Sequence, residues 1–161
     1  MDASVNRFFI FLLASTSDME PIDPRILKFI DEHHVLSLAI SRENQPYCAS
    51  CYYAYIPETN RFIFTSDHDT RHIRDVIEGN NYRAAGTIAL ETRMVGKIRG
   101  IQFTGLLEEL SGEPLKECRA AYLKAFPFAR LIPLHLWSLT PDFIKMTDNR
   151  LGFGKKLVWN G

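Results

Sequence analysis

Cysteine is scarce in this chain of 161 residues. Cys48, Cys51 and Cys118 form an odd-numbered set, and their spacing suggests no disulfide framework. A small secreted domain held together by disulfides is therefore not expected, and a reducing cytoplasm is the predicted compartment.

An excess of charge of one sign is also missing. Nineteen Lys and Arg residues balance nineteen Asp and Glu residues, and neither sign forms a long block. Nucleic acid and an anionic membrane surface both need a basic stripe, so neither partner is predicted. There is no GxGxxG or Walker pattern, which argues against dinucleotide and P-loop sites.

An apolar run near the N-terminus is far shorter than the roughly 20 residues of a membrane span. It covers residues 8–14, with Arg7 before it and three hydroxyl residues after it. It fits a short signal-peptide core, an added helix or an upstream extension of the reading frame, because a clean helix start follows Met19. We therefore divide the chain into an extension, residues 1–18, and one domain, residues 19–161. With 46% hydrophobic residues the chain can supply that domain's core.

Strand-like segments dominate the domain. Short helices are predicted from Asp23-Pro24 to His33, from Thr70 to a left-handed cap at Gly79, and from Glu113-Pro114 to Pro127. Gly100 and Gly105 suggest bulges or close backbone approach. Strands are predicted at residues 35–41, 47–55, 61–65, 84–91, 98–110, 134–139 and 143–147, followed by a basic tail with glycines. A parallel sheet would need more helical crossovers, so we expect a mainly β fold, an antiparallel barrel of about six strands.

Two metal-like patterns have ordinary alternatives. Cys48 and Cys51 match CxxC, but residues three apart on a strand point to opposite faces, so the thiols cannot easily meet. His68 and His72 are four apart, yet a helix that begins at Thr70 leaves His68 in the preceding loop. No metal site is predicted.

Residues 65–74 favour binding of a phosphate. Ser66 and Thr70 carry hydroxyls, Arg71 offers a planar fork of donors, and the first-turn N–H groups of the following helix have no intrahelical partner. The alternative is a capped helix with a solvated basic face.

Several motifs, in order, resemble the pyridoxamine 5′-phosphate oxidase-like FMN-binding split barrels. They lie at residues 34–40, 45–47, 62–66, 70–72 and 80–85, and the similarity spans roughly residues 22–110. The C-terminal third, residues 151–156 in particular, resembles an uncharacterised bacterial branch of that superfamily. The resemblance implies a six-stranded antiparallel split barrel and a homodimer that binds FMN in clefts between its subunits.

The resemblance also implies which residues hold FMN. Thr70, Arg71 and His72 occupy the positions of the family's phosphate-binding motif, and Thr65 and Ser66 match the end of the preceding strand. The strand beside the isoalloxazine ring matches Ala49, Ser50, Cys51 and Tyr52.

This chain departs from the oxidases at several positions. Ala49 and Ala54 stand where the oxidases carry Arg and Lys, Gly100 aligns with a Gln, and His72 replaces the Lys of the phosphate motif. The paired C-terminal Arg motif for the substrate is not recognisable. Oxidation of pyridoxamine phosphate is therefore not expected.

Two functions follow from the resemblance. The first is an FMN-dependent oxidoreductase acting on a small molecule, with Lys155, Lys156 or Trp137 reaching in from the partner subunit. The second is a non-catalytic carrier or sensor that binds flavin or haem, with His33, His34 and His135 as nominal axial ligands.

Overall fold

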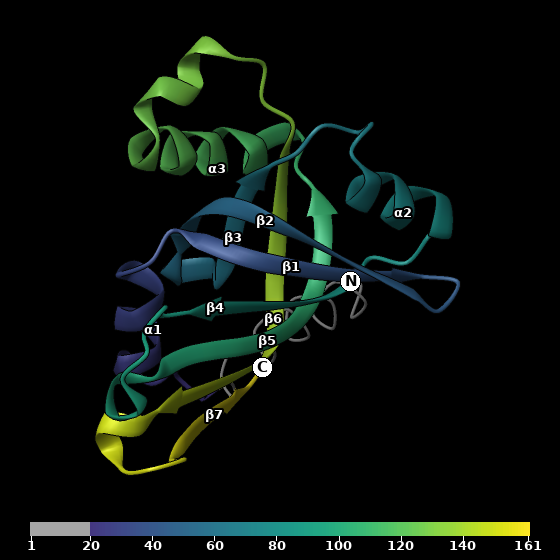
Figure 1. The fold of residues 1–161 in the computed structure, drawn as a ribbon. Helices are drawn as coiled ribbons and strands as arrows, with labels where there is room; N and C mark the ends of the chain where they lie inside the picture. The colour runs from purple at the N-terminus through teal and green to yellow at the C-terminus, as the bar shows by residue number, and fades with distance from the viewer. Residues whose placement is uncertain (1–19) are drawn as a thin grey trace, which may run out of the picture.

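We describe residues 20–161 of a computed structural model; the predicted extension, residues 1–18, lies outside the described part of the chain. Strands and helices follow one another as the sequence predicts as far as α3, and the strands after α3 differ (Figure 1). The strands are β1 (Val35–Arg42), β2 (Gln45–Ile56), β3 (Arg61–Thr65), β4 (Arg83–Ala89), β5 (Arg99–Glu109), β6 (Leu136–Asp148) and β7 (Lys156–Asn160). The helices are α1 (Pro24–Asp31), α2 (Arg71–Gly79) and α3 (Gly112–Ala125), with short 3₁₀ turns η1 (Pro57–Thr59), η2 (Val95–Lys97), η3 (Pro127–Leu131) and η4 (Asn149–Leu151).

The sheet closes on itself through six antiparallel strands. Its order is β3-β2-β1-β4-β5-β6-β7, and β3 also pairs with β6, from Phe62 opposite Leu139 to Thr65 opposite Leu136. The expected six-stranded antiparallel barrel is thus confirmed. The basic tail adds a seventh strand that the sequence analysis did not predict, because β7 pairs with residues 143–147 of β6.

A single long strand replaces the last two predicted ones. Residues 136–148 run through Thr140 and Pro141 without a break, because a bulge at Asp142 of β6, opposite the step from Thr104 to Gly105 in β5, absorbs the irregularity. A Cβ on Gly105 would lie 2.3 Å from the carbonyl oxygen of Thr140. The close backbone approach expected at this glycine is therefore confirmed.

Alternating burial along the strands fills the barrel. In β4 every second residue is buried, and Phe62 of β3 stacks on Phe103 of β5 inside the ring, with ring centroids 4.7 Å apart. A second, smaller cluster lies outside the ring, where α3 covers Ala54 and Ile63 with Cys118 and Tyr122. On the outside of the barrel, α3 therefore covers one face of the sheet, and another face stays exposed.

The helices begin where the sequence predicts. Asp23 caps α1 by accepting a hydrogen bond from the backbone of Arg25, and Thr70 is the N-cap of α2. One prediction was wrong: the left-handed cap of α2 is Asn80, with φ 47°, and not Gly79. Asparagine tolerates this conformation, and a Cβ on Gly79 would only touch the side chain of Arg42, 3.4 Å away. No helix of residues 20–161 is long and apolar enough to cross a membrane.

Candidate functional site

The junction between β3 and α2 brings three predicted side chains into one hydrogen-bonded chain. Thr70 Oγ1 donates to the carbonyl of Asp67 at 2.7 Å, so it can only accept from Ser66 Oγ, 3.0 Å away. The single proton of Ser66 is then used, and His72 Nε2 must donate to Ser66 Oγ at 2.8 Å. The geometry therefore fixes the tautomer of His72 and gives a polar cluster of Ser66, Thr70 and His72.

Backbone from β6 holds this junction in place. Ser66 N–H donates to the carbonyl of His135 at 3.0 Å, and Thr65 Oγ1 donates to the same carbonyl at 3.1 Å. The buried indole of Trp137 donates to the carbonyl of Ser66 at 3.1 Å. Trp137 thus acts within its own subunit, in contrast to the suggestion that it reaches a partner's site.

The first turn of α2 is left without a side-chain acceptor. Because the Thr70 hydroxyl points back to Asp67, it makes no capping hydrogen bond to the amides of the helix. Free amides and the positive end of the helix dipole form a binding site for an anion. A phosphate at this position would supply the acceptors that the cap does not.

Arg71 stands beside this turn in a fixed orientation. Its guanidinium lies over the ring of Tyr47 in β2, 4.4 Å from the centroid, and Arg71 Nε is 3.5 Å from Asp75 Oδ2. The side chain is still 55% exposed. Arg71 is therefore positioned in advance but keeps donors available for a ligand.

His72 lies partly buried behind the polar cluster. Burial lowers its pKa below the usual 6.5, because desolvation penalises the imidazolium form. His72 is therefore more neutral at pH 7 than an exposed histidine, and it serves the site mainly through its hydrogen bond to Ser66. The positive charge at this site comes from Arg71.

The four predicted residues of β2 split between two faces. Ser50 and Tyr52 point outward and are exposed, whereas Cys51 is buried in the barrel core and Ala49 packs partly against it. Burial raises the pKa of the Cys51 thiol to about 11, which leaves it protonated and unreactive. Only Ser50 and Tyr52 can offer side chains to a ligand on the outer face.

No metal site forms in the part of the chain that the structure describes. Cys48 is exposed while Cys51 is buried, so the two thiols stay apart as the strand geometry predicts. His68 Nε2 is 2.6 Å from Glu109 Oε1, and His72 turns to Ser66 instead. Among residues 20–161 no three His, Cys, Asp or Glu side chains gather around a common point.

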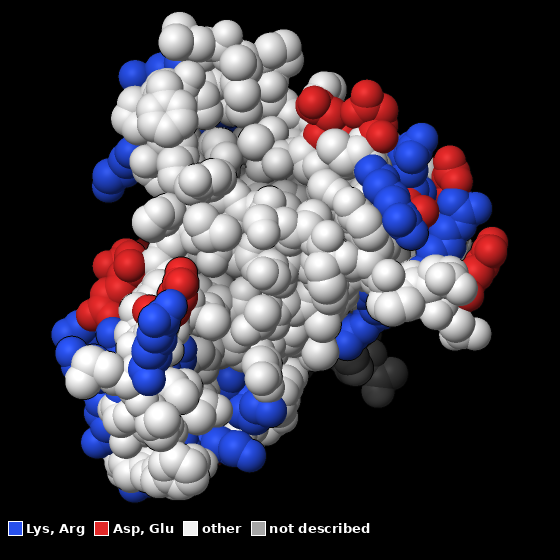
Figure 2. All heavy atoms as spheres, in the orientation of Figure 1, with Lys and Arg blue, Asp and Glu red and all other residues white. Residues whose placement is uncertain are grey.

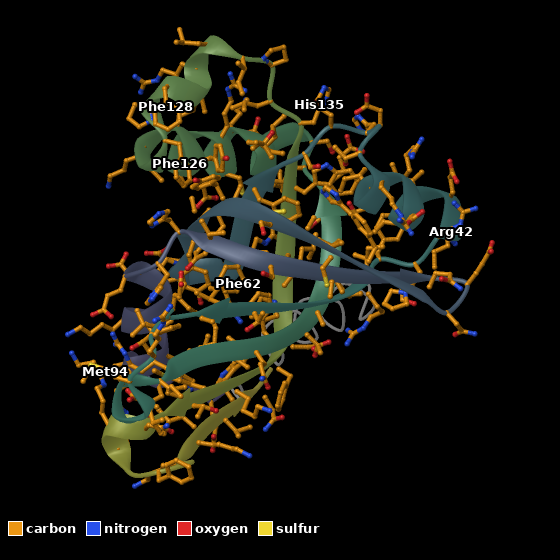
Figure 3. The ribbon with its side chains drawn as sticks, viewed as in Figure 1. Arg42, Phe62, Met94, Phe126, Phe128 and His135 are labelled. Atoms are coloured by element: carbon orange, nitrogen blue, oxygen red, sulfur yellow. The ribbon has the colours of Figure 1, made fainter. Side chains whose placement is uncertain are left out.

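A cavity of about 560 Å³ adjoins this site, and we call it the aromatic cavity. Tyr52 and Thr65 form one side of it, and residues of α3 and η3 form the other, with Phe126 and Phe128 lying over β2 in Figure 3. The cavity residues of α3 and η3 were not among the predicted site residues. The Phe-Pro-Phe run at the end of α3 could have indicated them, since aromatic side chains beyond the last turn of a helix have no helical face on which to pack. The lining consists of His34, Tyr52, Thr65, Tyr122, Phe126, Phe128, Ala129 and Ile132.

Lys155 and Lys156 lie away from the candidate site in this chain. They precede or begin β7, which pairs with the end of β6 opposite to Trp137. Their suggested role in a partner's site stays a prediction.

Comparison with solved structures identifies the class of fold. A haem-binding protein from Mycobacterium smegmatis superposes with a TM-score of 0.68 at 18% identity over 81% of this chain and 54% of that one. An FAD-binding protein from Mesorhizobium loti gives 0.64 at 17% identity over 76% and 89%. A candidate pyridoxamine 5′-phosphate oxidase from Listeria innocua gives 0.61 at 14% identity over 77% and 96%. The chain has the split-barrel fold of the pyridoxamine 5′-phosphate oxidase-like proteins, which confirms the resemblance read from its motifs.

Sequence comparison then identifies the family. No protein-family model matches the chain. A UPF0306 protein of Klebsiella pneumoniae is 40% identical over 132 residues, which is 82% of this chain and 88% of that protein. The UPF0306 protein YhbP of Escherichia coli O157:H7 is 35% identical over 134 residues, or 83% and 90%. The chain belongs to the UPF0306 family.

Proposed function

We propose that this protein is a homodimeric FMN-binding protein that acts as a flavin-dependent oxidoreductase on a small molecule. The observation that carries the proposal is the first turn of α2, whose amides lack a capping acceptor and stand beside Arg71 and the Ser66 hydroxyl. Amides, a planar guanidinium and hydroxyls are the groups that recognise a phosphate monoester.

The donor set fits the phosphate end of FMN. Arg71, Ser66, Thr70 and the first-turn amides would hold the phosphate, and Thr65 leads from there to the outer face of β2. Ser50 and Tyr52 present side chains along that face, where the isoalloxazine ring would lie. When bound, the flavin supplies hydride and electron transfer, while the protein supplies position and electrostatics.

Structural relatives support a cofactor-binding role of this kind. Two of the matched structures are described by name as a haem-binding and an FAD-binding protein. Their identity to this chain is 18% and 17%, so the likeness concerns the fold alone. The choice of FMN depends on the phosphate-sized anion site at α2.

An uncharged sheet face supports the homodimer. Figure 2 shows a broad area without charged side chains at the centre of the displayed face, with Lys, Arg, Asp and Glu at its margins. Small outward residues of β1, β2 and β4 line a groove there, namely Ser37, Ala39, Cys48, Ala85 and Thr87. Small uncharged side chains allow a second copy to approach closely. Sedimentation at micromolar concentration tests this proposal, and a pure monomer that still binds FMN would contradict it.

The phosphate site is tested by titrating FMN and riboflavin into wild type, Arg71→Ala and Arg74→Ala. Arg74 is the matched control, because it is an exposed arginine one turn further along α2. A charge-assisted contact is worth roughly 1.5–3 kcal/mol, so Arg71→Ala should weaken FMN binding about 10- to 100-fold. Riboflavin lacks the phosphate and should bind both variants like wild type. Equal losses of affinity for FMN and riboflavin would contradict a phosphate site and favour the alternative interpretation, a capped helix with a solvated basic face.

Haem is the second candidate ligand, and one observation favours it. The imidazole of His34 lines the aromatic cavity and stacks on Tyr52, with ring centroids 6.0 Å apart. His33 Nδ1 is already bonded to the carbonyl of Phe29 at 2.7 Å, and the ring of His135 meets His68. His34 is therefore the better axial candidate. The visible spectrum of the purified protein decides, since a Soret band that disappears in His34→Ala would favour haem over flavin.

A further inference from the structure

We infer that the aromatic cavity binds an uncharged, planar aromatic compound, which is the substrate class of the flavoprotein proposed above. That this ligand is a substrate rests on the proposed function, but the class of ligand that the cavity binds follows from its lining residues alone. Two features carry it: the geometry of the rings and the lack of charge among the lining residues.

The rings of the cavity form flat walls at different angles. Phe126 meets Tyr52 edge-on, with centroids 5.8 Å apart and planes at 76°, and lies 5.0 Å from the ring of Tyr122. The ring of His34 stacks on Tyr52, with planes only 14° apart. A planar ligand can stack on one of these rings while its edge meets another. The volume of about 560 Å³ suits a molecule of two or three fused rings.

Among residues 20–161, no charged side chain lines this cavity, whereas several line its neighbour. A second groove, on the other side of Phe126 and His34, is lined by Asp31, Glu58 and Glu117. None of these acids lines the aromatic cavity, whose polar groups are hydroxyls and the ring of His34. An ionised ligand would lose hydration there and gain no counter-charge, so a neutral ligand is favoured.

The position of the cavity relates it to the proposed flavin. Thr65 lines the cavity and directly precedes Ser66 of the polar cluster. A ligand in the cavity would thus lie beside the part of β2 along which the flavin ring is proposed to run. Phe128 and Ile132 are 74% and 55% exposed at the cavity's open side, and a bound aromatic compound would cover apolar surface that is now in water.

Menadione and 1,4-naphthoquinone-2-sulfonate are the probes, since they share a fused-ring shape and differ in charge. Calorimetric titration is run on FMN-loaded and FMN-free protein. Wild type should bind menadione and should bind the sulfonate at least about 10-fold more weakly, because the sulfonate must be desolvated. Ile132→Asp places a charge at the cavity's open side and should weaken menadione at least about 10-fold. Val158→Asp is the matched control, because Val158 is also 55% exposed but lies on β7.

The outcomes separate this inference from the proposed function. Equal menadione affinity in wild type and Ile132→Asp, or equal affinity for the two probes, would overturn the inference. Competition between FMN and menadione would also overturn it, because the cavity would then be the flavin ring's own site. If FMN does not bind but menadione does, and Ile132→Asp weakens menadione while Val158→Asp does not, the cavity's ligand class stands and the proposed flavin function fails. Phe128→Ala provides a second variant that adds no charge and should also weaken menadione.

Discussion

The contact between Gly105 and β6 gives the sharpest test of the barrel. A Cβ built on Gly105 would lie 2.3 Å from the carbonyl oxygen of Thr140 and 2.9 Å from the Cα of Pro141. Both opposing groups are backbone, so no side-chain rotation can relieve the clash. The φ of Gly105 is not in the left-handed region, and alanine could adopt its backbone conformation. Gly105→Ala therefore perturbs packing between two strands and little else.

The expected cost of this substitution is large for one methyl group. Overpacking a well-filled site costs typically 1–3 kcal/mol, and here β5 must move away from β6 at the bulge. We therefore expect the free energy of unfolding to fall by about 3 kcal/mol, a substantial part of the roughly 5–15 kcal/mol that stabilises a domain. With an m-value of about 2 kcal/mol per molar urea, the unfolding midpoint should fall by about 1.5 M.

Urea denaturation followed by tryptophan fluorescence measures this change, since both tryptophans, Trp137 and Trp159, are buried. Gly96→Ala is the control, because no atom lies within 4 Å of the Cβ it would add and its φ is negative or extended. That variant should be neutral or more stable by about 0.4–1 kcal/mol, as a less flexible unfolded chain predicts. A Gly105→Ala protein within about 0.5 kcal/mol of wild type would refute the described register.

Two further predictions concern single polar groups. Ser138 is fully buried and its Oγ has no hydrogen-bond partner among the described residues, so Ser138→Ala should raise the free energy of unfolding by about 1 kcal/mol in urea titrations. Burial holds the pKa of His72 below 6.5, so near and below that pH the unfolded chain binds more protons at His72 than the folded chain does. The contribution of His72 to the free energy of unfolding therefore becomes less favourable as the pH falls. A bound phosphate would raise the pKa of His72, so the affinity for FMN should decrease as the pH rises through the pKa that His72 has in the complex. His72→Gln should flatten this dependence of affinity on pH, which FMN titrations at several pH values measure. An unchanged profile in His72→Gln would remove His72 from the phosphate site.

The barrel was predictable because its strands show burial patterns that local sequence encodes. Strand β4 alternates buried and exposed residues, and Asp23 and Thr70 mark helix starts through their side-chain chemistry. The wrong predictions lie where distant backbone decides. Pro141 reads as a strand break, yet a bulge at Asp142, opposite the step from Thr104 to Gly105 in β5, keeps β6 continuous. Likewise β7 exists because β6 offers a free edge.

The polar cluster at the start of α2 was predictable for the same reason, since Ser66, Thr70, Arg71 and His72 lie within seven residues. The support from β6 was not, because Trp137 is 71 residues away from Ser66 in sequence. Opposite faces for Cys48 and Cys51 were predictable from strand geometry, but the resemblance matches a stretch of strand and does not say that Cys51 is the buried one. The aromatic cavity needs β2 and η3 to meet, which only the closed fold arranges.

The departures from the oxidase pattern agree with a neutral substrate. Ala54, where the oxidases carry Lys, is buried in the cluster under α3, beside the residues that form one wall of the aromatic cavity. Ala49, where they carry Arg, packs partly against the barrel core. A long cation at either position would have to displace packed apolar side chains or lie buried without a partner. Only Ala54 of the two belongs to the cluster that shapes the cavity, and Ala49 belongs to the barrel core. Without cations at these two positions, Arg71 would be the charge that holds an anion at the proposed site, which suits one phosphate on the proposed cofactor and none on the proposed substrate.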